Sequence, residues 1–189
     1  MTVEHGGMTS PIECDRSKSS PINNATGNGT AVIIRAATTE DATRVYDLIN
    51  ENLVSGHLLA RPLREIELHV PHFLVATNSN DVIGCAELVS LTLTVAEIRS
   101  LVVTADHRGR GVGGRLLEAL VAQAVSQHVP RVCAFTHQPQ PFIHAGFSIV
   151  PHPWVPEKIA TDCQGCDLFL RCNQYAVILD LKQPLGETA

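Results

Sequence analysis

The chain has 189 residues, enough for one domain with a proper hydrophobic core, and its 44% hydrophobic and 17% charged residues exclude a disordered protein. Its net charge of -5 excludes a general basic surface for nucleic acid, so an anionic ligand would depend on local arginines. No apolar run reaches the roughly 18 residues of a membrane span and no signal peptide opens the chain, so we expect a cytoplasmic protein that binds neither membrane nor nucleic acid.

Residues 1–30 are rich in Ser, Asn, Gly, Thr and Pro, which predicts a disordered arm, with a docking segment as the alternative. A first strand is expected at 32–36. Thr38 and Asp41 form a capping-box pattern at the start of a helix. The apolar positions of this helix share one face: Ala42, Val45, Leu48, Ile49 and Leu53. Gly56 should end it.

Pro62 suits the first turn of a second, short helix that reaches His69. An antiparallel meander should follow, because turn residues separate three apolar runs. These runs lie at 73–77, 82–91 and 95–103.

A long helix at 111–128 should stop before Pro130, and the next strand is expected at 131–135. Because a helix connects this strand to the strand at 95–103, the two should be parallel. A short helix and a last hairpin should complete a single domain. They are expected at 141–145, 147–150 and 176–181, in a domain of residues 31–182 with a tail at 183–189.

The stretch from Leu101 to Arg115 passes from a β-branched run through a polar loop into closely set glycines that open the long helix. N–H groups at a helix N-terminus favour an anion, and glycine lets a phosphate approach the backbone. Arg108, Arg110 and Arg115 add positive charge. The pattern predicts a phosphate-binding loop, with a simple tight turn as the alternative.

Gly109-x-Gly111-x-x-Gly114 also matches the fingerprint of dinucleotide-binding proteins. That fingerprint requires a tight turn directly after the strand and an acidic residue about 20 positions later. Here a polar loop intervenes, and the next apolar run ends without Asp or Glu. The nicotinamide hypothesis is therefore disfavoured.

Arg108-x-x-Gly111-x-Gly113 resembles the acetyl-CoA pyrophosphate loop of the GNAT superfamily of N-acetyltransferases. Residues 97–103 resemble the fourth strand of that family, and residues 141–147 its second motif. The resemblance covers about residues 32–181. It implies an α+β (α/β) fold: a mixed central sheet of about six to seven strands, with the fourth and fifth splayed apart and helices on both faces.

The resemblance also implies acetyl-CoA as cosubstrate and the residues that bind it. The pantetheine arm would bond to the backbone of the fourth strand at Leu101, Val102 and Val103. The diphosphate would lie on the loop and helix start, at Arg108, Gly109, Arg110, Gly111, Val112, Gly113 and Gly114.

Acetyl transfer requires a deprotonated amine that attacks the thioester. Glu97, at the start of the fourth strand, is the expected base through a water, and a solvated edge residue is the alternative. The backbone N–H of Val102 is expected to polarise the carbonyl. Phe142 stands where many members place the Tyr that protonates the leaving thiolate. Because Phe cannot donate a proton, the candidate donors are Thr136, His137 and His144.

Residues 55–66, 96–101 and 156–172 resemble the corresponding segments of short bacterial N-acetylglutamate synthases. The implied reaction is acetylation of the α-amine of glutamate, or a relative such as glutamine, at the first step of arginine synthesis. The expected acceptor ligands are mostly cations, which suit carboxylates. They are Arg61, Arg64, Arg99, Ser100 and Lys158.

Departures from the synthase pattern leave the acceptor open. Leu91-Thr92-Leu93-Thr94-Val95 replaces a Tyr-Trp-containing stretch, and His137 replaces a tyrosine. The alternatives are a GNAT enzyme with another amine acceptor, and a CoA-binding sensor without transfer activity. A homodimer is also left open.

Cys163-x-x-Cys166 and Cys172 offer three thiols, whereas a structural zinc usually takes four ligands. We expect no metal in the active site. For this cluster zinc, a redox pair and plain reduced thiols remain alternatives.

Overall fold

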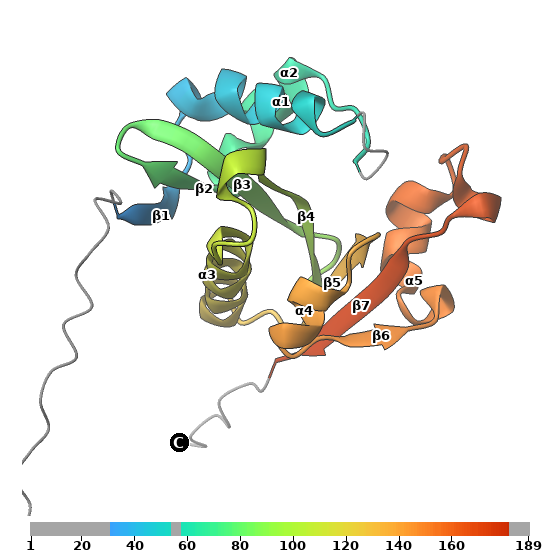
Figure 1. Ribbon diagram of the computed structural model, residues 1–189. Helices are drawn as coiled ribbons and strands as arrows, with labels where there is room; N and C mark the ends of the chain where they lie inside the picture. Colours follow the sequence, from blue (N-terminus) through green and yellow to red (C-terminus); the bar gives the residue numbers. More distant parts are fainter. Residues whose placement is uncertain (1–30, 54–57, 182–189) are drawn as a thin grey trace, which may run out of the picture.

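The computed structural model describes residues 31–53 and 58–181, which form a seven-stranded sheet between two layers of helices (Figure 1). The order of the strands is β1-β2-β3-β4-β5-β7-β6. Their bounds are β1 Val32–Ala36, β2 Phe73–Asn78, β3 Asp81–Ser90, β4 Val95–Val103, β5 Arg131–Thr136, β6 Ser148–Val150 and β7 Tyr175–Asp180. The expected meander and the last hairpin are confirmed.

The strands β4 and β5 form the parallel pair of the sheet, as their helical connection predicts. Their pairing covers three residue pairs, from Val95↔Arg131 to Glu97↔Cys133. Past Glu97 the register ends, while β4 continues to Val103 and β5 to Thr136. The two strands therefore diverge, as the family resemblance implies, and β4 presents one backbone edge without a β5 partner.

The helices α3 (Val112–Ser126) and α4 (Gln140–His144) cover one face of the sheet. The buried positions of α3 include Leu116, Leu117 and Leu120, which are fully buried in the same core cluster as residues of β2 to β5. Burying one such leucine stabilises the fold by roughly 1.5–3 kcal/mol. This apolar stripe fixes the start of α3, and the glycine loop before it, against the sheet.

The opposite face is covered by α1 (Ala42–Glu51) and α2 (Leu63–His69) (Figure 1). All four of the predicted helix-face residues within α1 are buried, and Leu53 packs at the edge of the same cluster. Helices therefore lie on both faces, as expected. The predicted helix end at Gly56 lies outside the described residues, as do the predicted arm at 1–30 and the tail at 183–189.

The predicted capping box is confirmed, although a 3-10 turn, η1 (Thr39–Asp41), precedes α1. The Asp41 carboxylate accepts hydrogen bonds from the Thr38 N–H (2.7 Å) and from Arg35 (2.7 Å). The Arg35 bond, together with Thr38, overcomes partial burial and lowers the pKa of Asp41 to about 2. The carboxylate thus ties the end of β1 to the start of the helical layer.

Pro62 precedes α2 as its N-cap instead of occupying its first turn. Short 3-10 turns, η3 (Val70–His72) and η4 (Ala105–His107), lead into β2 and the glycine loop. The long segment between β6 and β7 holds four single turns. They are η5 (His152–Trp154), α5 (Pro156–Lys158), the π-helical η6 (Ile159–Cys163) and η7 (Phe169–Arg171). Among the described residues, no helix combines the length and apolarity needed to span a bilayer.

Candidate active site

A β-bulge in β4 shapes the site. Glu87 of β3 pairs with Arg99, but Cys85 pairs with Val102, so two residues of β4 oppose one of β3. Ser100, within the bulge, has a φ of 53°, which few non-glycine residues adopt. Bulges bend a strand and re-aim its side chains. The bulge lies in the part of β4 that has no β5 partner.

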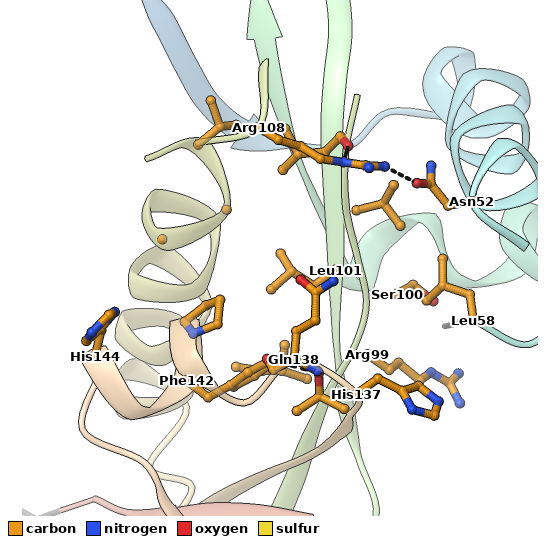
Figure 2. Close-up of a pocket in the computed structure, with 18 of the residues that line it drawn as sticks. Asn52, Leu58, Arg99, Ser100, Leu101, Arg108, His137, Gln138, Phe142 and His144 are labelled. Carbon is orange, nitrogen blue, oxygen red and sulfur yellow. Dashed lines mark hydrogen bonds between the residues drawn. The ribbon is translucent and has the colours of Figure 1, made fainter. Parts of the chain in front are cut away.

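A pocket of about 830 Å³ occupies the gap between the diverging strands (Figure 2). One wall is β4 from Ile98 to Val103, the second is the glycine loop with the start of α3, and the third is the end of β5 at residues 135–138. Two residues of the helical layer, Asn52 and Leu58, also line it. Its volume is within the usual range for small-molecule sites.

The glycine loop opens toward this pocket. Gly109 (φ 72°) and Gly111 (φ 79°) adopt the left-handed conformation, and Gly111 directly precedes α3. A Cβ built at Gly109, Gly111 or Gly114 would meet no atom within 4 Å. The Arg115 N–H bonds back to the Gly111 carbonyl, so the N–H groups of the preceding first-turn residues point out of the helix. Open space in front of free amides fits a diphosphate, and with it the CoA moiety.

Of the three arginines around the loop, Arg108 lines the pocket. Its Nε donates to the Val103 carbonyl (2.9 Å), and its Nη2 donates to Asn52 Oδ1. Arg110 and Arg115 are exposed, and neither is among the described residues that line the pocket. Arg110 was expected at the diphosphate, and the structure places it outside the pocket.

The backbone of β4 presents alternate residues to the pocket. The bond from Arg108 shows that the Val103 carbonyl faces the pocket, whereas the Thr104 N–H donates to Ile83 of β3 (2.8 Å). Since neighbouring residues of a strand point their backbone groups to opposite sides, Val102 turns its N–H toward β3. This geometry does not favour the Val102 N–H as the group that polarises the thioester carbonyl. Because backbone groups alternate along the strand, the N–H of the neighbouring Leu101 points toward the pocket instead.

Glu97 lies at the end of the β4–β5 pairing and is only 2% exposed, so the alternative of a solvated edge residue is wrong. Lys158 Nζ, from the segment after β6, lies 2.8 Å from its carboxylate and 2.7 Å from Asp162. Burial raises the pKa of Glu97 despite the opposing effect of the Lys158 charge. Glu97 does not line the pocket itself but directly precedes Ile98, which does.

Several of the predicted acceptor ligands meet at a residue that the sequence did not single out, Glu87 of β3. This carboxylate is fully buried and contacts Arg61 (2.6 Å), Arg99 (2.8 Å) and His69 (2.7 Å). Burial opposes its ionisation, but the bond from Arg99 and the charge of Arg61 hold its pKa below the usual value. The signal in the sequence was a single charged residue within the apolar stretch from Val82 to Val89 of β3.

Among the predicted acceptor ligands, Arg99 and Ser100 line the pocket. Arg61 is buried beneath them, where its Nη1 donates to Ser100 Oγ (3.0 Å). Arg64 is exposed, and neither it nor Lys158 lines the pocket as the described residues form it. The structure thus brings Arg61, Arg99 and Ser100 together and separates Arg64 from them.

The candidate proton donors line the pocket at the end of β5 and in α4, on the side where Phe142 lies. Phe142 is buried and packs edge-to-face on Phe147, with 5.4 Å between ring centroids. Phe142 lines the pocket together with Thr136, His137 and His144. Figure 2 labels Phe142, His137 and His144. Thr136 Oγ1 accepts a hydrogen bond from the Gln138 N–H (3.0 Å), which fixes the turn after β5.

The thiols of Cys163, Cys166 and Cys172 are unbridged and partly buried. Within residues 31–53 and 58–181, no group of three or more His, Cys, Asp or Glu side chains could hold a metal ion. The zinc alternative therefore has no support in this geometry.

Comparison with known proteins gives the family of this chain. Residues 42–147 match the family described as acetyltransferase (GNAT) family. An uncharacterized N-acetyltransferase from Chlorobaculum tepidum is 30% identical over 148 residues, which cover 78% of this chain and 96% of that protein. An amino-acid acetyltransferase from Shewanella oneidensis is 29% identical over 140 residues. The chain spans only 32% of the length of this second relative.

Two solved structures share the fold. A Mycobacterium tuberculosis protein solved in complex with CoA has a TM-score of 0.69 at 24% identity, over 79% of this chain and 99% of that one. N-acetylglutamate synthase from Neisseria gonorrhoeae, complexed with coenzyme A and N-acetyl-glutamate, has a TM-score of 0.72 at 24% identity, over 81% of this chain and 36% of that one. The chain belongs to the acetyltransferase (GNAT) family, which confirms the acetyl-CoA-dependent N-acetyltransferase predicted from its sequence.

Proposed function

We propose that this enzyme transfers the acetyl group of acetyl-CoA to the α-amine of glutamate, or of a close relative such as glutamine, in the cytoplasm at the first step of arginine synthesis. The observation that carries the proposal is the arginine pair Arg61 and Arg99 beside the pocket between the diverging strands. The names of the amino-acid acetyltransferase relatives support the same acceptor class.

The donor binds along β4 and the glycine loop in this proposal. The pantetheine arm adds to the free backbone edge at Leu101–Val103, where it replaces the missing strand partner. The diphosphate lies on the amides from Gly109 to Gly114, where the α3 dipole and Arg108 favour negative charge. The thioester then reaches the bulge near Ser100.

The acceptor binds with its carboxylates toward Arg99, Ser100 and Arg61. Glu87 holds both guanidinium groups in fixed orientations, and a preoriented guanidinium suits bidentate contact with a carboxylate. Lys158 adds a cation on the other side of Glu97. Arg64 and Arg110 are exposed and do not line the pocket, so they contribute only long-range positive charge.

Proton transfer needs a base with a pKa near the working pH. Burial raises the pKa of Glu97, which is the direction that a base requires, and a water from the pocket connects it to the amine. The amide of Leu101 polarises the thioester carbonyl. The CoA thiolate leaves with a proton from Thr136, His137 or His144, since Phe142 has no proton to give.

Phe142 favours one second candidate, a CoA-binding sensor that does not transfer acetyl. A buried phenylalanine in the position of the usual proton donor would slow departure of the thiolate. An unassisted thiolate with an ordinary pKa near 8.5 is a tolerable leaving group, so we favour the enzyme.

The test is an end-point assay with the full chain, acetyl-CoA and a panel of glutamate, glutamine, aspartate, the other amino acids, polyamines and an acceptor peptide. Mass spectrometry of the acetylated product avoids interference from the cysteines of the protein. Glutamate or glutamine should be the preferred acceptor by kcat/KM. Preference for a polyamine or the peptide would overturn the acceptor assignment. CoA binding without a product would favour the sensor.

A further inference from the structure

Asn52 and Arg108 both line the pocket, and their side chains point toward each other (Figure 2). Asn52 is the C-cap of α1, in the helical layer, and Arg108 belongs to the glycine loop, 56 residues later. Arg108 Nη2 donates to Asn52 Oδ1. The bond joins the α1–α2 layer to the loop that precedes α3.

The orientation of the Asn52 amide is set by its own helix. Its Nδ2 donates to the Leu48 carbonyl (2.7 Å), one of the acceptors that a helix end leaves without an intrahelical partner. With the donor side of the amide committed to α1, the oxygen faces Arg108. Asn52 is therefore a fixed acceptor.

Arg108 is held at two points. Its Nε donates to the Val103 carbonyl (2.9 Å) at the end of β4, and its Nη2 donates to Asn52. A guanidinium has five N–H donors, so these two bonds leave others for a ligand. A long side chain that is ordered before the ligand arrives spares the ligand that entropic cost.

We propose that Asn52 is a positioning residue that preorients Arg108 for the diphosphate of acetyl-CoA. This inference rests on the proposed function, because it requires that CoA occupies the pocket. Asn52 acts through Arg108 and needs no contact with the acetyl group or with the amine.

The competing explanation is that Asn52 only caps α1. A purely structural cap would affect every ligand of the pocket alike, whereas a positioning role concerns the diphosphate. Pantetheine, which lacks the diphosphate, separates the two explanations.

The experiment measures dissociation constants for CoA and for pantetheine by calorimetry with the full chain. Asn52→Ala should weaken CoA binding about fivefold, as loss of one hydrogen bond does, and leave pantetheine binding unchanged. In an Arg108→Ala background the same substitution should have little further effect. The matched control is Asn50→Ala in α1, which does not line the pocket.

A second variant, Asn52→Asp, keeps an acceptor but adds a negative charge opposite Arg108. It should weaken CoA binding more than Asn52→Ala does, because the carboxylate competes with the diphosphate for the guanidinium. If Asn52 only capped α1, Asn52→Asp would not be expected to bind CoA more weakly than Asn52→Ala.

Two results would overturn the proposal. One is that Asn52→Ala weakens the binding of CoA and of pantetheine equally, and the other is that it weakens CoA binding just as much in the Arg108→Ala background. If the parent acetylates its acceptor normally and Asn52→Ala binds CoA as the parent does, only this inference fails. If the parent binds no CoA at all, the proposed function fails first and the inference with it.

Discussion

Lys158 Nζ lies 2.8 Å from the carboxylate of Glu97, although 61 residues separate the two in the chain. The bond connects the segment after β6 to the point where β4 and β5 part. It places a cation beside the proposed base, and it makes the pKa of Glu97 the outcome of two opposing effects, burial and a neighbouring positive charge.

Glu97→Gln should lower kcat by about 10²- to 10⁴-fold, the usual contribution of a general base, with unchanged CoA affinity. In the parent, the rate should fall as pH falls through the pKa of Glu97, which lies above the ordinary glutamate value. Lys158→Met removes the charge that lowers this pKa, so the acidic limb of the kcat/KM profile should move to higher pH. A profile that stays in place in Lys158→Met would exclude Glu97 as the titrating base.

Glu87→Gln should destabilise the fold by about 3–5 kcal/mol, because it leaves the buried guanidinium of Arg61 and the half-buried guanidinium of Arg99 without their shared carboxylate. The matched control is Glu65→Gln, which breaks the contact of a partly exposed carboxylate with the same Arg61. This control should cost at most about 1 kcal/mol. Urea unfolding followed by circular dichroism measures both. If the free energy of unfolding fell by a similar amount in both variants, Glu87 would not be the residue that holds Arg61 and Arg99 together.

Gly111→Ala should lower the free energy of unfolding by roughly 1–2 kcal/mol, because the left-handed conformation of residue 111 is unfavourable for alanine. It should also weaken CoA binding, since the new methyl group occupies the open space before the α3 amides. Gly165→Ala is the control, because it too would meet no atom but lies outside the pocket. Unchanged CoA affinity in Gly111→Ala would contradict the diphosphate site.

Asp41→Asn should cost about 1 kcal/mol at neutral pH through loss of the capping box. The pKa of Asp41 is about 2 in the folded protein, below that of the unfolded chain. A lowered pKa stabilises the fold above the unfolded value, near 4, and this stability is lost as pH falls toward 2. The parent should therefore lose more stability than Asp41→Asn between pH 4 and pH 2. Parallel curves for the two proteins would rule out this linkage.

The amino-acid order alone determined much of the fold, because local patterns carry it. Apolar runs separated by turn residues predict the meander, the spacing from Ala42 to Ile49 predicts the buried face of α1, and the chain from Arg108 to Gly113 predicts the diphosphate loop. In each case the physical cause acts within a few residues: turn formation, helical periodicity, or glycine at positive φ.

Contacts between distant segments were decided by the tertiary structure. The sequence proposed Arg61 and Arg99 as separate ligands, and folding joins them through Glu87, because a buried carboxylate must be paired. The sequence also predicted both Arg108 and Arg110 at the diphosphate, but of these two only Arg108 turns into the pocket, toward Asn52. Composition and spacing report which charges are present, whereas desolvation and packing across the sheet decide which of them meet.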